Sequence, residues 1–252
     1  MSVKVLDVFL VYNILMEKIT LILKEIKQET EDVKTLVFVL ENNKKLDFKA
    51  GQYLNLFFSN DKDGHGKPYT ISSAPCDDIH ITVKNMGSFS GKLHKMKLGE
   101  KIEAVGPLGF MILSEMEDLD GDIVFIAGGI GVTPFYSMIK DIFQNGKKNN
   151  ISFFYANQKK ESIIFYDELE KINKENNNFN FYHFLSRDKK FKAQNVKNRR
   201  LEMEDLMDTL GDVKSKIFFI CGSIKFVNDF WKDLKENGAK EDNIFTEAFF
   251  VG

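Results

Sequence analysis

The most constraining feature of the sequence is residues 123–135, IVFIAGGIGVTPF, where an apolar run is followed by glycines, a threonine and a proline. The β-branched apolar run predicts a strand buried in a parallel sheet, and Gly128, Gly129 and Gly131 permit a sharp turn and close approach of a ligand. Pro134 suits the first turn of a helix, where the N–H that proline lacks has no intrahelical partner. The amides of such a helix start bind phosphate. Because Pro134 stands where the usual dinucleotide fingerprint has a third glycine, an ordinary strand–helix turn remains the alternative.

The hydrophobic pattern changes partway along the chain. Up to about residue 105, short strands separated by polar turns predict a closed or nearly closed antiparallel β-barrel. Beyond it, strands alternate with helical stretches, which predicts a parallel sheet covered by helices on both faces. We therefore expect two domains, a β-barrel over 16–113 and an α/β nucleotide-binding domain over 122–252, with an acidic linker at 114–121 between them.

Residues 1–15 form an N-terminal extension that we treat separately. Its apolar segment, 8–15, is shorter than the roughly 20 residues of a membrane helix, and the lack of a small-residue cleavage site argues against a secretory signal. We expect either an extra strand or short helix on the first domain, or a natural start at Met16, because regular strand patterning begins only after that residue.

The charge balance and the cysteines argue against several classes of protein. Lys and Arg number 35 and Asp and Glu 37, so no basic field favours nucleic acid. Cys76 and Cys221 are too few for an iron–sulfur cluster and form no CxxC motif, and they favour a reducing, cytoplasmic setting. The histidines lack metal-ligand spacing, so we expect no metal site.

Polar or glycine-rich residues follow the apolar runs of the second domain. These segments are Gly128 to Thr133, Tyr155 to Asn157, Ser186-Arg187 and Cys221-Gly222. In an open parallel sheet, ligands bind at the carboxyl ends of the strands, so the segments together predict one nucleotide cleft.

The first domain carries a second cluster, residues 67–73 (KPYTISS), which places a cation, an aromatic ring and hydroxyls in one short strand and its exit. Residues 87–90 (GSFS) then precede a short helix, and this glycine-and-hydroxyl start also suits a diphosphate. One anion-adapted helix start in each domain indicates two dinucleotides that meet between the domains.

Several motifs follow one another along the chain: Lys67-Pro-Tyr69-Thr70-Ile-Ser-Ser73, Gly87-x-x-Ser90, Gly106-Pro107-Leu108-Gly109, Gly128-Gly129-Ile130-Gly131-Val132-Thr133-Pro134 and Cys221-Gly222. From about residue 17 to the C-terminus, their order resembles the ferredoxin-NADP reductase family of flavoproteins. The resemblance implies an FAD-binding Greek-key barrel followed by an NAD(P)-binding domain, in which hydride passes from nicotinamide to flavin.

The resemblance also implies roles for individual residues. Tyr69 would stack on the isoalloxazine ring and Thr70 would lie near the flavin N5. Lys67 stands where the family usually has arginine beside the FAD diphosphate; it keeps the charge without the bidentate fork, so FMN is an alternative to FAD. The implied flavin-binding residues are Lys67, Tyr69, Thr70, Ser73, Val83, Gly87, Ser90 and Phe250. The implied nicotinamide-binding residues are Gly128, Gly129, Gly131, Thr133, Ser186, Arg187, Cys221 and Gly222, and the implied catalytic residues are Tyr69, Thr70, Cys221 and Glu247.

Ser186-Arg187 resembles the pair that NADP-using relatives place against the 2′-phosphate, and nearby Lys189, Lys190 and Lys192 add positive charge. This favours NADPH, although NADH remains open because the segment after residue 155 lacks the basic residue often found there in the family. We expect an FAD-dependent oxidoreductase that passes hydride from NAD(P)H to flavin and electrons to a separate acceptor, such as ferredoxin, flavodoxin or a small molecule. The alternatives are a flavin subunit of a larger redox complex and a non-catalytic nucleotide-binding module of the same fold.

Overall fold

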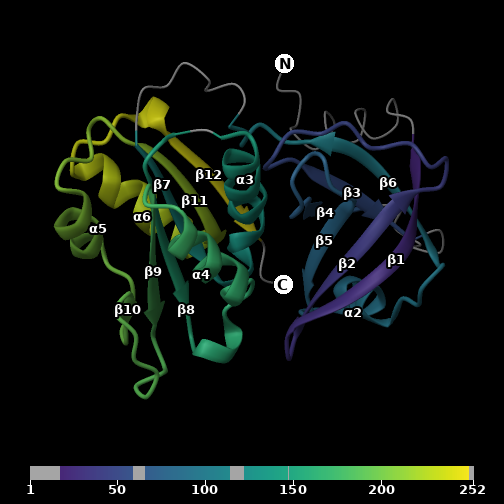
Figure 1. The fold of residues 1–252 in the computed structure, drawn as a ribbon, viewed down its shortest axis with the longest axis horizontal. Helices are drawn as coiled ribbons and strands as arrows, with labels where there is room; N and C mark the ends of the chain where they lie inside the picture. The colour runs from purple at the N-terminus through teal and green to yellow at the C-terminus, as the bar shows by residue number, and fades with distance from the viewer. Residues whose placement is uncertain (1–17, 59–65, 114–121, 147, 250–252) are drawn as a thin grey trace, which may run out of the picture.

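The computed structural model describes residues 18–58, 66–113, 122–146 and 148–249. Figure 1 shows two domains side by side, an N-terminal sheet domain in purple and blue and a C-terminal α/β domain in green and yellow. The predicted linker and the predicted N-terminal extension lie outside the described residues. No helix in the described part of the chain is long and apolar enough to cross a membrane.

The N-terminal domain is a six-stranded antiparallel sheet in the order β4-β3-β6-β1-β2-β5. The strands are β1 (Ile19–Thr30), β2 (Val33–Leu40), β3 (Tyr53–Phe57), β4 (Lys67–Thr70), β5 (Ile79–Lys84) and β6 (Lys101–Leu108), and the helix α2 (Ser88–Lys95) follows β5. An isolated bridge between Ile71 and Ile81 joins the exit of β4 to β5 and brings the two edges of the sheet together. The predicted antiparallel barrel is confirmed, and the place of β6 between β3 and β1 is a Greek-key connection.

Alternation along the strands builds the core of this domain. Leu21 and Leu23 of β1 face the same side as Leu36 and Phe38 of β2, and all are at most 1% exposed. The alternation therefore fixes which face of each strand points into the barrel core, independently of the second domain.

The C-terminal domain is a six-stranded parallel sheet in the order β10-β9-β8-β7-β11-β12. Its strands are β7 (Ile123–Gly128), β8 (Ile151–Asn157), β9 (Phe179–Leu185), β10 (Val196–Lys197), β11 (Ile217–Ser223) and β12 (Ile244–Phe249). Its helices are α3 (Val132–Gln144), α4 (Tyr166–Glu175), α5 (Met203–Leu210) and α6 (Ile224–Glu236), with 3₁₀ turns at η2 (Gly129–Gly131), η3 (Lys160–Ser162) and η4 (Glu241–Asn243). The predicted α/β domain is confirmed.

Both faces of the parallel sheet are buried, as its continuous apolar strands require. Phe125 packs with Phe135 and Ile139 of α3 on one face, which α4 also covers. Val124 and Ile126 pack on the other face with α5 and α6, through side chains such as Val227 of α6. The carboxyl ends of the strands are left to form the site.

Helix α3 holds the two domains together. The Ser137 hydroxyl is fully buried and donates to the Ser73 carbonyl of the barrel at 2.6 Å. The Lys140 ammonium pairs with Asp77 at 2.6 Å. Barrel residues such as Met111 join the core that α3 forms with its own sheet. The barrel and the strand ends of the α/β domain therefore meet along one interface (Figure 1).

Candidate nucleotide and flavin site

The glycine turn after β7 forms a single 3₁₀ turn, η2, before α3 begins. Gly129 has a φ of +54°, which a glycine adopts without strain. A Cβ atom on Gly131 would lie 2.3 Å from the Cys221 carbonyl oxygen, so the turn packs directly on the end of β11. Thr133 is 2% exposed and its hydroxyl donates to the Ile130 carbonyl at 3.1 Å. Gly131 and Thr133 thus shape the turn, while Gly128 and Gly129 line a groove at the surface.

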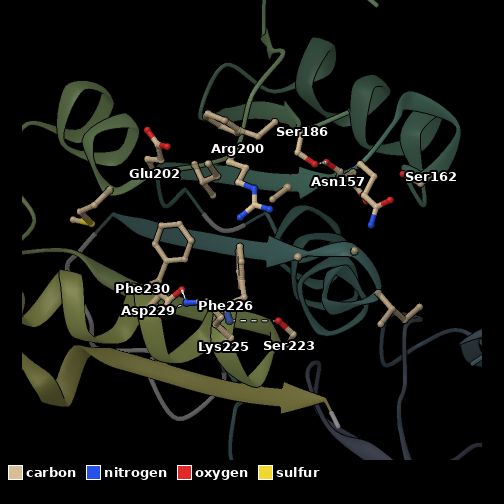
Figure 2. A pocket seen from close by; sticks show the side chains of 18 of the residues that line it. Asn157, Ser162, Ser186, Arg200, Glu202, Ser223, Lys225, Phe226, Asp229 and Phe230 are labelled. Atoms are coloured by element: carbon tan, nitrogen blue, oxygen red, sulfur yellow. Dashed lines mark hydrogen bonds and ion pairs between the residues drawn. The ribbon is translucent and has the colours of Figure 1, made fainter. Parts of the chain in front are cut away.

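A groove of about 1310 Å³ runs along the carboxyl ends of the central strands. The residues that line it there include Gly128, Gly129, Asn157, Ser186, Arg187 and Ser223. Figure 2 shows Asn157 and Ser186 on one side of the groove and Ser223 on the other. The segments that the sequence singled out after β7, β8, β9 and β11 are therefore brought to one cleft by the parallel topology.

Arginine, rather than the lysine-rich loop, brings positive charge into the groove beside Ser186. Arg187 and Arg200 both line it, and Figure 2 shows the guanidinium of Arg200 pointing into its middle. The lysines between 189 and 192 are exposed and are not among the lining residues. Sequence reasoning missed Arg200, for which the only signal was the Arg199-Arg200 pair directly before α5.

Aromatic side chains form the opposite wall of the groove. Phe226 of α6 lies over two glycines: a Cβ on Gly222 would be 2.8 Å from its ring, and a Cβ on Gly128 would be 3.5 Å away. Phe230 packs beside it, with ring centroids 4.9 Å apart (Figure 2). Gly222 is therefore required by the Phe226 ring, and an apolar surface suited to a planar ligand continues from the strand ends.

The barrel supplies a second set of groups on β4. Tyr69 is half-buried and nearly parallel to Phe89, with centroids 6.0 Å apart, and burial raises the pKa of its hydroxyl to about 12. Thr70 is 4% exposed, and among the described residues its hydroxyl oxygen has no hydrogen-bond partner. Lys67, at the start of the strand, is exposed. Within four residues, β4 therefore offers a cation, then a neutral aromatic ring, then a hydroxyl without a hydrogen-bond partner.

Other residues expected around the flavin have structural partners. Ser73 is fully buried, and its side chain accepts from the His80 amide at 3.2 Å while its carbonyl binds α3. Ser90 accepts from the amide of Gly87 at 3.0 Å and donates to the carbonyl of the same residue at 3.1 Å, so it fixes the start of α2. Val83 is a core residue of the barrel. Gly87 differs, because a Cβ there would meet nothing within 4 Å.

A carboxyl group of unusual pKa lies where the two domains meet. Glu247 on β12 is in register with Cys221 on β11, and burial raises the pKa of Glu247 to about 7. Burial, followed by the charge of Glu247, raises the pKa of the Cys221 thiol well above its ordinary value and that of the barrel residue Tyr53 as well. Tyr53 is paired with Thr70 across β3 and β4, so the two side chains share one face. The barrel and α/β groups therefore converge here; Phe250 lies outside the described residues.

The arrangement fits a flavin. A buried hydroxyl without a partner costs about 1–3 kcal/mol, and a polar edge of a ring lying against Thr70 would satisfy it. Tyr69 offers the aromatic face on which such a ring stacks. In the part of the chain that the structure describes, no group of three or more His, Cys, Asp or Glu side chains could hold a metal ion.

Comparison with known proteins agrees with the fold and with its division into two domains. The family model for the oxidoreductase FAD-binding domain matches residues 20–112, and the model for the oxidoreductase NAD-binding domain matches residues 125–232. Together they span most of the chain. The chain belongs to the ferredoxin-NADP reductase family of flavoproteins, and its two domains are of the kinds that bind FAD and a nicotinamide dinucleotide.

Individual relatives are similar over nearly the whole chain. The glycine betaine monooxygenase reductase subunit of Pseudomonas aeruginosa is 28% identical over 228 residues, which cover 88% of this chain and 62% of that protein. The cytochrome P450 reductase of Amycolatopsis superposes with a TM-score of 0.81 at 20% identity, over 93% of this chain and 70% of that one. A ferredoxin NADP+ reductase from Neisseria gonorrhoeae with bound FAD and NADP has a TM-score of 0.75 at 21% identity, over 93% and 99%. The chain spans 57 to 62% of the length of several curated relatives.

Proposed function

We propose that the protein passes hydride from NADPH to FAD and then electrons to a separate acceptor. The observation that carries the proposal is the convergence of two sites at the domain interface. Gly128 and Gly129, at the end of β7, line the groove of the α/β domain, and β7 pairs with β11. Glu247, in register with Cys221 of β11, is close enough to Tyr53 to raise the pKa of that barrel residue. A dinucleotide lying along the groove would bring its reactive end to the face that bears Thr70.

The residues of the chain position the reactants and hold a proton. Bound flavin supplies the exchange between a two-electron donor and a one-electron acceptor. When FAD is bound, Tyr69 would stack on its ring and the Thr70 hydroxyl would donate to its polar edge. Glu247, with a pKa of about 7, can hold or release a proton near neutral pH. Cys221 is fully buried, and the raised pKa of its thiol keeps it protonated, so it would offer the donor a small neutral group at the end of β11.

Arg187 and Arg200 support NADPH as the donor. Both line the groove beside Ser186, and a guanidinium binds a phosphate dianion through parallel N–H donors. The ribose of NADH presents a hydroxyl at the same position, which gains much less from two cations. The groove therefore favours the phosphorylated dinucleotide.

The acceptor is proposed to be a separate protein, with ferredoxin or flavodoxin as candidates. A second candidate function is a reductase component of a multicomponent oxygenase. It is supported by the similarity over 88% of this chain to a protein named as a monooxygenase reductase subunit. Both functions use the same flavin and donor chemistry, and they differ only in the partner that takes the electrons.

The test begins with the visible spectrum of the purified protein. We expect flavin absorbance that is bleached anaerobically by NADPH faster than by NADH, and reoxidation by ferredoxin or flavodoxin. A colourless protein that is not reconstituted by FAD or FMN would refute the function. Bleaching without turnover of either acceptor, restored by an oxygenase component, would favour the second candidate.

A further inference from the structure

Residues 197–200 lead from the end of β10 toward α5, and side-chain bonds that lie outside the groove hold them in place. It carries three cations, Lys197, Arg199 and Arg200, and only Arg200 is among the residues that line the groove. We infer that Asp205 is a positioning residue that binds Lys197 and Arg199, directs Arg200 into the groove, and so sets the preference for NADPH. The inference rests on the proposed function.

Asp205 is a fully buried carboxylate on the first turn of α5. One oxygen accepts from the Lys197 ammonium at 2.7 Å. The Arg199 guanidinium binds both oxygens as a fork, one of them from Nη1 at 2.6 Å. The amide of Glu202 donates to the carboxylate at 3.2 Å. Every bond that the carboxylate accepts therefore comes from the 197–200 segment or from the start of α5.

These bonds outweigh the cost of burying the charge. Burial by itself would raise the pKa of Asp205, but the hydrogen bonds from Lys197 and Arg199 hold it below the ordinary value. The side chains of Lys197 and Arg199 are 45% and 47% exposed, whereas that of Asp205 is not exposed at all. Removing the carboxylate would leave Lys197 without this ion pair and Arg199 with only the exposed Glu202 carboxylate at 3.7 Å, so the segment would lose its buried anchor.

The anchor extends to the backbone of Arg200. Arg199 donates from the same Nη1 atom to the Arg200 carbonyl at 3.1 Å, so the guanidinium that binds Asp205 also fixes the next residue. On the other side of the segment, the Asn198 amide donates to the Asp188 carbonyl at 2.6 Å and to the Phe191 carbonyl at 3.0 Å. These bonds tie the segment to the loop that follows Ser186-Arg187.

Arg200 is thus held between two anchors, one on α5 and one on the loop after β9. Its guanidinium points into the middle of the groove in Figure 2, on the same side as Ser186. With Lys197 and Arg199 bound to Asp205, the segment presents the Arg200 side chain to the groove from an anchored backbone. An anchored backbone leaves fewer conformations to be lost when the guanidinium binds a phosphate, so the phosphate binds more strongly.

The experiment compares Asp205→Asn with the control Asp212→Asn in the full chain. Asp212 follows α5, is exposed, does not line the groove and takes no part in the ion pairs with Lys197 and Arg199, so its substitution should leave bisphosphate binding as in the wild type. Titration calorimetry with adenosine 2′,5′-bisphosphate and with AMP reads binding without turnover. We expect Asp205→Asn to weaken the bisphosphate about tenfold, or about 1.4 kcal/mol, with AMP changed less than about twofold. Steady-state kinetics should show a higher KM for NADPH with kcat retained.

Two further variants keep every outcome decisive. Arg199→Gln leaves Asp205 paired with Lys197 and removes the fork together with the bond to the Arg200 carbonyl, so it should reproduce most of the loss and serves if Asp205→Asn does not fold. Arg200→Ala should lower bisphosphate affinity by a similar factor. If Arg200→Ala changes nothing, Arg200 does not bind the phosphate and the inference is wrong, whereas a wild-type protein that binds the bisphosphate no better than AMP would refute the proposed preference for NADPH. If Arg200→Ala weakens binding while the folded Asp205 and Arg199 variants bind as wild type does, the positioning role is wrong.

Discussion

The substitution Gly131→Ala tests whether the turn after β7 is shaped by its contact with β11. The added Cβ would lie 2.3 Å from the Cys221 carbonyl oxygen, 2.6 Å from its carbonyl carbon and 2.9 Å from the Gly222 nitrogen. Ordinary van der Waals contact begins at 3.4 Å, so the first distance is 1.1 Å too short (3.4 − 2.3). All three atoms are backbone and cannot rotate away. The turn must therefore move by about 1 Å from β11, at the cost of overpacking, about 1–3 kcal/mol.

The assay is urea or thermal unfolding of Gly131→Ala beside Gly91→Ala. For a chain of this size the cost corresponds to a fall in Tm of about 2–12 °C. Gly91, inside α2, has its nearest neighbour at 3.5 Å, so alanine fits there and should stabilise the helix by about 0.5–1 kcal/mol. A Tm of Gly131→Ala within about 1 °C of the wild-type value, with Gly91→Ala raised as expected, would show that the contact with β11 does not shape the turn.

Three further predictions address the site. In the flavin-free protein, Thr70→Val removes a buried hydroxyl that has no partner among the described residues, so the free energy of unfolding should stay the same or rise. In the flavin-loaded protein, anaerobic bleaching by NADPH should slow. A large loss of stability in the flavin-free variant would contradict the unpartnered hydroxyl. Burial raises the pKa of Glu247 to about 7 in the folded protein. Between about pH 4.5 and pH 7 the unfolded chain therefore binds fewer protons at this residue than the folded protein does, so wild-type stability should fall as the pH rises through that window. Glu247→Gln should flatten this fall, and an unchanged pH profile in urea unfolding would count against the shift. Arg187→Ala should raise the KM for NADPH far more than that for NADH, and equal effects in steady-state assays would refute the assignment of the 2′-phosphate to this residue.

The sequence predicted the fold because the signals were local. Buried parallel strands are apolar throughout, whereas barrel strands alternate between apolar and polar residues. The run at 123–127 therefore predicts a parallel strand, and the alternation at Leu21 and Leu23 predicts a barrel strand, without tertiary information. The strand ends were equally predictable. Once the sheet is parallel, Gly128, Asn157 and Ser186 must emerge at one edge.

Individual roles within the motifs were harder to predict, because one residue type serves two purposes. Gly131 and Gly128 are three residues apart in one motif, yet Gly131 is required by the backbone of β11 and Gly128 lines the groove. Likewise the hydroxyls of Ser73 and Ser90 are engaged by the protein itself, whereas that of Thr70 is buried with no partner among the described residues. Only the positions of neighbouring atoms separate these cases.

By itself, the sequence determined the two domains, their order and the strand ends that meet in the groove, because periodicity and glycine turns act over a few residues. The tertiary structure alone decided which charges serve the site. It turned Arg200 into the groove, buried Asp205 against Lys197 and Arg199, and placed Glu247 close to a tyrosine of the other domain. Such pairings join residues on different elements, and the desolvation that shifts a pKa depends on everything packed around the group.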